Sequence, residues 1–122
     1  IPLETDFLAI SSYGAATSSS GVVKIRKDID VDITGRHVIV VEDIVDSGLS
    51  LQYIKDYLAK HEPASLKICV LLDKPAAHTQ EVKFDYVGFE IGNEFVVGYG
   101  LDFKSQYRNL PYIGILKEEI YS

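Results

Sequence analysis

The chain has 122 residues, 47% hydrophobic and 25% charged, which is typical of one globular domain. Its net charge of −6 argues against a broad nucleic-acid surface, and no apolar run approaches the roughly 20 residues that a membrane-spanning helix needs. The single cysteine, Cys69, cannot form an internal disulfide, so we expect a buried thiol and a reducing, cytoplasmic setting.

The first 36 residues predict a strand, a polar loop and a return strand. Residues 7–10 are apolar and residues 22–27 partly alternate, so we expect a mobile antiparallel hairpin. Residues 14–21 are small and polar, and two interpretations stay open for them: a simple connector or a lid over a reacting centre. Residues 28–36 carry three aspartates, but the glycine and glutamate of a calcium-binding loop are misplaced, so we expect a solvated connector.

The most informative segment begins with four β-branched residues at 38–41, which predict a fully buried strand. Two adjacent acids, Glu42 and Asp43, follow at its end, and Asp46 comes next. A helix start provides backbone N–H groups and a dipole that favour a phosphate, and carboxylates suit sugar hydroxyls or hydrated Mg²⁺. The segment therefore predicts a site for a metal–phosphate–sugar compound, with the phosphate held at Ser47, Gly48, Leu49 and Ser50.

The rest of the chain alternates between helix and strand patterns. Leu51, Ile54 and Leu58 recur at helical spacing and predict a helix over about residues 49–61. Further strands are predicted at residues 65–72, 84–91 and 112–116. Nearly continuous apolar strands around a helix predict an α/β fold, with a parallel core sheet flanked by helices, in a single domain over residues 1–122.

The segment VVEDIVDSGLS at residues 40–50 resembles the signature of the type I phosphoribosyltransferases, enzymes that use phosphoribosyl pyrophosphate. Five more motifs resemble the hypoxanthine-guanine phosphoribosyltransferases and follow that family's order: SSYG at 11–14, LLDKP at 71–75, VGFEI at 87–91, FVVGYGLD at 95–102 and YRNLPY at 107–112. The resemblance implies purine salvage. The expected reaction is Mg²⁺-dependent transfer of the phosphoribosyl group to N9 of hypoxanthine or guanine, giving IMP or GMP plus pyrophosphate.

The resemblance also implies a role for each residue of the central segment. Glu42 and Asp43 would hold the ribose hydroxyls and contribute to the Mg²⁺ site. Asp46 would lie near N7 of the purine as a general base or acid, a task that suits a nearby carboxylate. The 5′-phosphate would be cradled by Ser47, Gly48, Leu49 and Ser50.

Three residues would contact the purine base. By the resemblance, Lys74 would donate to the 6-oxo group, Phe95 would stack on the purine, and the backbone of Val96 would pair with the purine edge. Considered without the family, Lys74 would be a surface lysine that extends its ammonium to water, and Phe95 would be a core residue.

Four further residues are assigned to the metal, the pyrophosphate and the closing loop. By the resemblance, Asp102 would coordinate Mg²⁺ and Arg108 would contact pyrophosphate, whose oxygens match a forked guanidinium. Considered alone, both would be ordinary surface charges. Ser12 and Tyr13 match the family's mobile loop, which would close over the reacting centre and exclude water.

The chain also departs from the family pattern. Members usually have a segment ahead of the position of Ile1, so we expect an N-terminal strand and a pyrophosphate loop to be absent here and one sheet face to be exposed. The expected partners are phosphoribosyl pyrophosphate, an oxopurine base and further copies of the chain in a dimer or tetramer, without nucleic acid or membrane. Two alternatives stay open: an RNA-binding regulator of the same fold, and an inactive fragment of the enzyme.

Overall fold

The computed structural model describes residues 1–13 and 22–121 of the chain. These residues form two compact units, Ile1–Glu90 and Ile91–Ser122. The loop expected at residues 14–21 lies outside the described residues, so its mobility stays a prediction, as does the single domain over residues 1–122.

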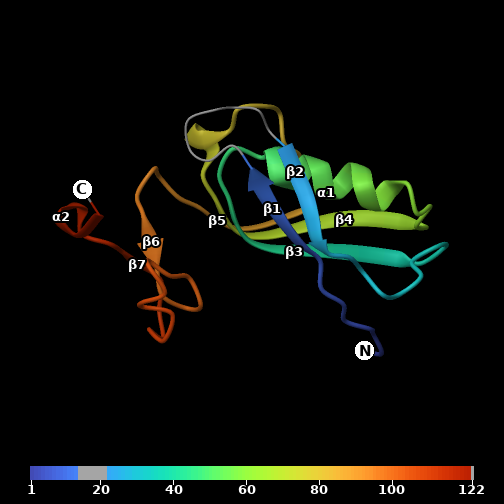
Figure 1. Cartoon of the computed structure of the whole chain (residues 1–122), viewed down its shortest axis with the longest axis horizontal. Helices are drawn as coiled ribbons and strands as arrows, with labels where there is room; N and C mark the ends of the chain where they lie inside the picture. The colour runs from blue at the N-terminus through green and yellow to red at the C-terminus, as the bar shows by residue number, and fades with distance from the viewer. Residues whose placement is uncertain (14–21, 122) are drawn as a thin grey trace. The chain divides into compact units, whose positions relative to one another are not determined.

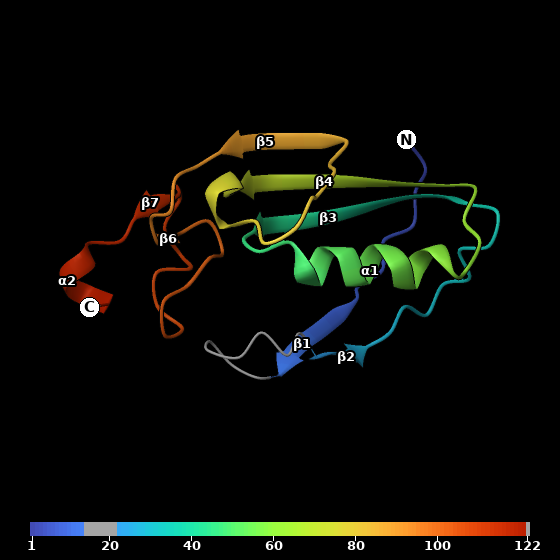
Figure 2. The same cartoon turned by 90° about the horizontal axis from the view of Figure 1, so that it is seen from above.

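A three-stranded parallel sheet organises the Ile1–Glu90 unit. Its strands are β3 (His37–Val45), β4 (Ser65–Asp73) and β5 (Tyr86–Glu90), which lie side by side in that order (Figure 2). Parallel neighbours need a crossover connection, and helix α1 (Leu49–Ala59) provides it between β3 and β4. A short 3₁₀ helix, η1 (Pro75–Ala77), follows β4. The predicted α/β class and parallel sheet are confirmed.

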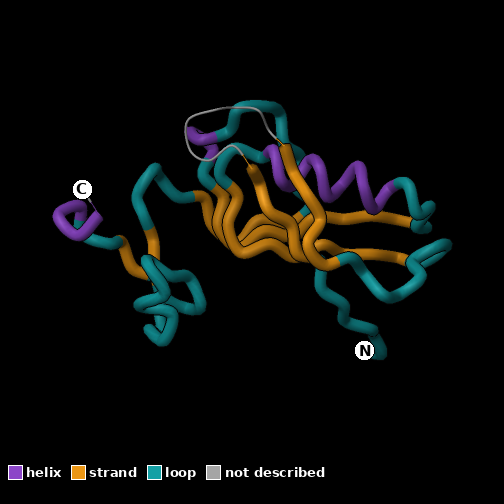
Figure 3. Tube along the Cα trace, in the orientation of Figure 1, coloured by secondary structure: helices purple, strands orange, loops and turns teal. Residues whose placement is uncertain are grey.

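The core of this unit lies between α1 and one face of the sheet (Figure 3). The three periodic residues of α1 are all buried, as the sequence pattern predicts. Strand β4 places alternate side chains on the same face, because successive strand residues point to opposite sides. The buried residues of the core divide into two clusters, one of Val45, Leu51, Ile68 and Val70 and one of Ile33, Ile54 and Leu58.

The opposite face of the sheet is open in the described part of the chain. Along β3, Val38 and Val40 are half-buried, whereas Ile39 is 60% and Val41 is 74% exposed. On β5, Tyr86, which aligns through Cys69 with Val41, is also exposed. The prediction of a fully buried strand at residues 38–41 is therefore wrong, because α1 covers only one side of β3. The expected exposed face is present.

The antiparallel hairpin is formed by β1 (Ala9–Tyr13) and β2 (Val22–Lys27), as predicted (Figure 1). The carboxylate of Asp6, just before β1, accepts the N–H groups of Asp30 and Val31 at 2.7 and 3.0 Å. These backbone hydrogen bonds, together with one from Phe7, lower the pKa of Asp6 to about 2. Asp6 thereby ties the first residues of the chain to the connector before β3.

The Ile91–Ser122 unit contains β6 (Val96–Val97), β7 (Gly114–Ile115) and α2 (Glu118–Tyr121). Strands β6 and β7 pair antiparallel, and β7 is shorter than the strand predicted at residues 112–116. Strand β6 stops at Val97 because Gly98 and Gly100 take left-handed φ angles of 96° and 98°, which turn the chain. Among the described residues of both units, no helix is long and apolar enough to cross a membrane.

Candidate active site

Two of the predicted site acids lie near the carboxyl end of β3. Glu42 is half-buried and Asp43 is exposed, which agrees with the alternation of side chains along a strand. Burial raises the pKa of the Glu42 carboxyl, and the neighbouring charge of Asp43 raises it further. Glu42 therefore binds a proton more readily than an exposed glutamate, and a nearby cation would favour its ionised form.

The turn between β3 and α1 leaves the start of the helix open. Gly48 is the N-cap residue with a φ of 89°, and no side chain caps the helix there. The hydroxyl of Ser47 accepts the Leu49 N–H at 3.3 Å. A hollow of about 240 Å³ lies against this turn, lined by Glu42, Ile44, Val45, Asp46, Ser47, Gly48, Ser50 and Leu51. A helix start beside an open hollow is suited to an anion such as a phosphate.

Lys74 and Asp46 form an ion pair between the ends of β4 and β3. The Lys74 Nζ lies 3.3 Å from Asp46 Oδ1, and the Lys74 side chain is only 12% exposed whereas that of Asp46 is 63% exposed. The parallel register aligns Val45 with Asp73, so the residues that follow each strand meet. The surface-lysine interpretation of Lys74 is therefore wrong, because the side chain is held inward by a carboxylate.

In the second unit, Asp102 and Arg108 occupy one loop. Arg108 Nη2 lies 3.4 Å from Asp102 Oδ1, and Arg108 Nη1 donates to the Gly100 carbonyl at 2.9 Å. The other oxygen of Asp102 accepts the Ser105 N–H at 2.7 Å. Both residues thus help to shape the loop that carries them, and the Arg108 side chain stays exposed.

Phe95 precedes β6 and Val96 begins it. The ring of Phe95 packs edge-on against Phe103 at 5.6 Å between centroids and stacks with Tyr121 at 5.4 Å, yet 37% of the residue stays exposed. Phe95 is thus an aromatic platform that is partly covered and partly open, and neither a buried core residue nor a free surface ring.

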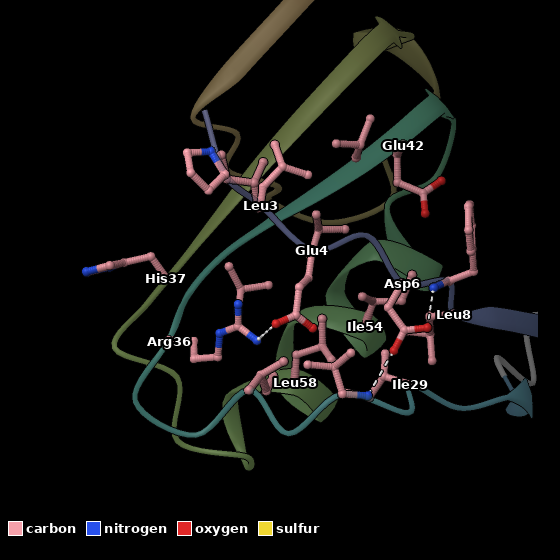
Figure 4. Close-up of a pocket in the computed structure, with 18 residues that line it drawn as sticks. Leu3, Glu4, Asp6, Leu8, Ile29, Arg36, His37, Glu42, Ile54 and Leu58 are labelled. Atoms are coloured by element: carbon pink, nitrogen blue, oxygen red, sulfur yellow. Dashed lines mark hydrogen bonds and ion pairs between the residues drawn. The ribbon is translucent and has the colours of Figure 1, made fainter.

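A larger hollow lies elsewhere, along the edge of β3 that pairs with no described strand (Figure 4). It encloses about 380 Å³ and is lined by apolar and charged side chains of the N-terminal segment, the connector before β3, β3 and α1. Glu4 and Arg36 point toward one another across it and form an ion pair of 3.0 Å. Among the predicted site residues whose side chains the structure describes, only Glu42 lines it, so its size does not mark the candidate active site.

Comparison with known proteins decides the family. A model of the phosphoribosyl transferase domain matches residues 1–104. Over 120 residues the chain is 56% identical to hypoxanthine-guanine phosphoribosyltransferase of Streptococcus pneumoniae, which covers 98% of this chain and 67% of that protein. The chain belongs to the hypoxanthine-guanine phosphoribosyltransferase family. It therefore belongs to a family of enzymes, and it spans about two-thirds of the length of the curated relative it matches.

Solved structures of hypoxanthine-guanine phosphoribosyltransferases share the fold. The Bacillus anthracis enzyme matches with a TM-score of 0.86 and 54% identity, over 92% of this chain and 66% of that one. A mutant Trypanosoma cruzi hypoxanthine phosphoribosyltransferase, described as a ternary substrates complex, matches with a TM-score of 0.92 and 43% identity, over 100% of this chain and 65% of that one. The predicted family and fold are confirmed.

Within each unit, the structure brings together several residues that the family resemblance selects. The first unit gathers the acids of β3, the turn before α1 and Lys74, and the second gathers Asp102 and Arg108. Ser12 and Tyr13 pair with Val23 and Val22 at the end of the hairpin, but their side chains lie outside the described part of the chain. The individual roles in substrate binding stay predictions.

Sequence reasoning missed a buried pair beside Lys74. Asp73, the last residue of β4, is 4% exposed, and His78 Nε2 lies 2.6 Å from its Oδ1. The available signal was an acid at the end of a strand predicted to be buried, in the same LLDKP motif that selected Lys74. A carboxylate in that position needs a hydrogen-bond partner, and a search for one would have reached His78.

Proposed function

We propose that the protein transfers the phosphoribosyl group of phosphoribosyl pyrophosphate to N9 of hypoxanthine or guanine, giving IMP or GMP plus pyrophosphate. The observation that carries the proposal is the placement of Asp46 between an open helix start and the Lys74 ammonium. One short segment thus provides a phosphate-binding helix terminus and a carboxylate for proton transfer. Family membership supports the same reaction.

The first unit would hold the ribose 5′-phosphate part of the substrate. The 5′-phosphate would bind at the turn from Ser47 to Ser50, where no side chain caps the helix and a hollow lies against its start. The ribose hydroxyls would donate to the carboxylates of Glu42 and Asp43, which are acceptors when ionised.

Asp46 and Lys74 would act on the purine. As N9 forms its bond to the ribose carbon, the ring must lose a proton from N7, and Asp46 would accept it. Lys74 would donate a hydrogen bond to the 6-oxo group, a preference that selects oxopurines over adenine. Since the two side chains form an ion pair of 3.3 Å, a base that engages both would replace part of that contact.

The second unit would contribute the aromatic surface and the pyrophosphate contacts. The exposed part of Phe95 would stack on the purine, and the Val96 backbone would pair with the purine edge. The Arg108 guanidinium would bind pyrophosphate oxygens.

The carboxylates fit Mg²⁺ that arrives with its substrate. The described residues contain no cluster of three or more His, Cys, Asp or Glu side chains that could hold a metal by themselves. Mg²⁺ keeps several waters and binds through one or two carboxylates plus substrate phosphates, so Glu42, Asp43 and Asp102 are suitable donors without a dedicated cage. When bound, Mg²⁺ would neutralise the charge that develops on the leaving pyrophosphate.

We extend the proposal to compartment and assembly. Cys69 is a free thiol, which suits a reducing, cytoplasmic compartment. The exposed apolar side chains Ile39, Val41 and Phe89 favour a homo-oligomer, because apolar surface of this kind promotes association.

The substitution Asp46→Asn tests the chemistry. We expect kcat to fall about a hundredfold or more, the usual contribution of a general base, with the KM values for both substrates nearly unchanged. Hypoxanthine-dependent pyrophosphate release measures both parameters, and Asp56→Asn, an exposed acid on α1 that pairs with Gln52, is the matched control.

Two results would contradict this proposal. Turnover of the Asp46→Asn variant at the wild-type rate would remove Asp46 from the mechanism. Absence of pyrophosphate release by the wild-type chain, together with salt-dependent RNA binding, would favour the regulatory alternative.

A further inference from the structure

We propose that Asp73 and His78 are positioning residues that together fix Lys74 and the turn at residues 45–48. The inference rests on the proposed function, because it assigns the pair to the site that would bind the ribose phosphate and the purine. Neither residue lines the hollow at the helix start, so the pair would act through its neighbours.

Asp73 stands out by its burial. It is the charged side chain that the described residues bury most fully, at 4% exposure. A carboxylate only accepts hydrogen bonds, so the His78 Nε2–H donates to it across 2.6 Å. The His78 ring also lies edge-on to Phe84, 6.0 Å between centroids. Removing the donor would leave a buried acceptor without a partner, which is unfavourable.

The pair closes a short loop around Lys74. The Lys74 N–H donates to the Val45 carbonyl at 3.0 Å, and the Lys74 carbonyl accepts the Ala77 N–H at 3.0 Å. His78 at the far end of η1 is bound back to Asp73 at its near end. The Lys74 backbone is therefore fixed on both sides, and its ammonium is aimed at Asp46.

The next residues of the same segment hold the turn before α1. Both the backbone N–H and the hydroxyl of Thr79 donate to the Ser47 carbonyl, at 3.1 and 3.4 Å. The side-chain amide of Gln80 donates to the Gly48 carbonyl at 3.3 Å. In a trans peptide the carbonyl and the N–H point in opposite directions. Anchoring these two carbonyls turns the N–H groups of Gly48 and Leu49 away from Thr79 and Gln80.

One hydrogen bond, between His78 and Asp73, would thus set two parts of the site. His78 directly precedes Thr79, so the bond that holds His78 to Asp73 also fixes where Thr79 meets the Ser47 carbonyl. Lys74, on the other side, directly follows Asp73. If this hydrogen bond is removed, we expect the Lys74 ammonium and the turn at residues 45–48 to become less well ordered.

The test uses the whole 122-residue chain and the substitution His78→Phe, which keeps an aromatic ring and removes the donor. His61→Phe is the matched control, because His61 is also half-buried and its Nδ1 lies 3.1 Å from the Tyr57 carbonyl at the other end of α1. His78→Gln retains an N–H donor and tests rescue. The readouts are the Kd for guanosine 5′-monophosphate by calorimetry, and amide exchange of Thr79 by NMR in the free chain.

We expect His78→Phe to weaken nucleotide binding about tenfold or more, because small misplacements of binding groups have large effects. Its Thr79 amide should exchange faster, whereas His61→Phe should leave both readouts unchanged and His78→Gln should restore much of the affinity. Wild-type affinity together with wild-type Thr79 exchange in a folded His78→Phe chain would overturn the inference.

A double variant, Asp73→Leu/His78→Phe, separates positioning from simple stability. Replacing a buried pair by apolar residues often preserves or raises stability. A positioning role predicts that this variant melts near the wild-type Tm but still binds the nucleotide weakly, and wild-type binding by it would contradict that role. If the wild-type chain itself binds no nucleotide, the proposed function fails, and Thr79 exchange alone decides the inference.

Discussion

The turn at residues 45–50 and the loop at residues 99–108 both carry candidate site acids, but different parts of the chain hold them. The turn is stabilised by residues outside it in the sequence, since Lys74, Thr79 and Gln80 all donate hydrogen bonds to its carbonyls. The loop is stabilised by hydrogen bonds among its own and adjoining residues. Gly98 and Leu101 exchange two backbone hydrogen bonds of 2.9 and 3.0 Å, and Phe103 and Gln106 do the same at 3.1 and 3.0 Å.

The backbone conformations follow this difference. The turn needs one left-handed residue, and glycine supplies it at position 48. The loop places four side-chain-bearing residues at positive φ: Tyr99, Lys104, Ser105 and Tyr107. Such conformations persist only where surrounding bonds over-determine them. The turn therefore depends on the segment after β4, whereas the loop depends on its own hydrogen bonds.

The largest expected effect comes from Gly98→Ala in the second unit. At Gly98 a new Cβ would overlap the carbonyl oxygen of Tyr112, a backbone atom that cannot rotate away. Together with a φ of 96°, this should lower the free energy of unfolding of the unit by about 4 kcal/mol. Urea unfolding followed by the amide signals of this unit measures the loss.

Gly100→Ala is the matched control for that loss. Its φ is 98°, and a Cβ there would meet no atom within 4 Å, so only the left-handed backbone costs free energy, about 1–2 kcal/mol. Equal losses for the two substitutions would show that the loop adapts to the overlap and is less self-contained than its bonds suggest.

Gly48→Ala should have a smaller effect in the first unit. The new Cβ would overlap a methyl group of Val82, which is a side-chain atom that can move, so we expect a loss of about 2–3 kcal/mol. Gly35→Ala is the control, with a φ of 69° and no atom within 4 Å, and should lose only the backbone part. Since Val82 belongs to the segment that braces the turn, Gly48→Ala should also speed amide exchange of Thr79, and Gly35→Ala should not.

Much of the first unit could be predicted from sequence, because its signals are local and periodic. The helix predicted at residues 49–61 is α1 at Leu49–Ala59, and the strand predicted at 65–72 is β4 at Ser65–Asp73. The prediction that β3 is fully buried was wrong, because a run of β-branched residues predicts a strand but does not show how many of its faces are covered.

The candidate site was less predictable, because its contacts depend on register. The ion pair of Lys74 and Asp46 requires Val45 of β3 to align with Asp73 of β4. No local sequence pattern predicts this register. The same holds for the bonds from Thr79 and Gln80 to the turn. The motif resemblance could select residues, but the long-range contacts that position them had to come from the structure.

The smallest expected effects have opposite signs at Glu42, on β3 ahead of the turn, and at Asp102 in the loop. Burial and the charge of Asp43 raise the pKa of Glu42, so ionisation of Glu42 opposes folding once the pH rises through that pKa. Glu42→Gln should therefore raise the Tm at pH 7, and the gain should vanish below about pH 4, where an unfolded glutamate is also protonated. Glu81→Gln, at an exposed acid, is the control for the loss of one charge.

Asp102→Asn should instead lower the stability of the second unit. Its carboxylate accepts the Ser105 N–H at 2.7 Å and faces Arg108, so removing the charge weakens bonds that hold left-handed residues in place. Thermal unfolding of both variants at pH 7, followed by the amide signals of each unit, checks the two signs. Shifts of the same sign would mean that the acids of the two regions are held alike. Opposite shifts would mean that Glu42 is kept at a cost to stability, as expected for a residue retained for binding, whereas Asp102 also supports its own loop.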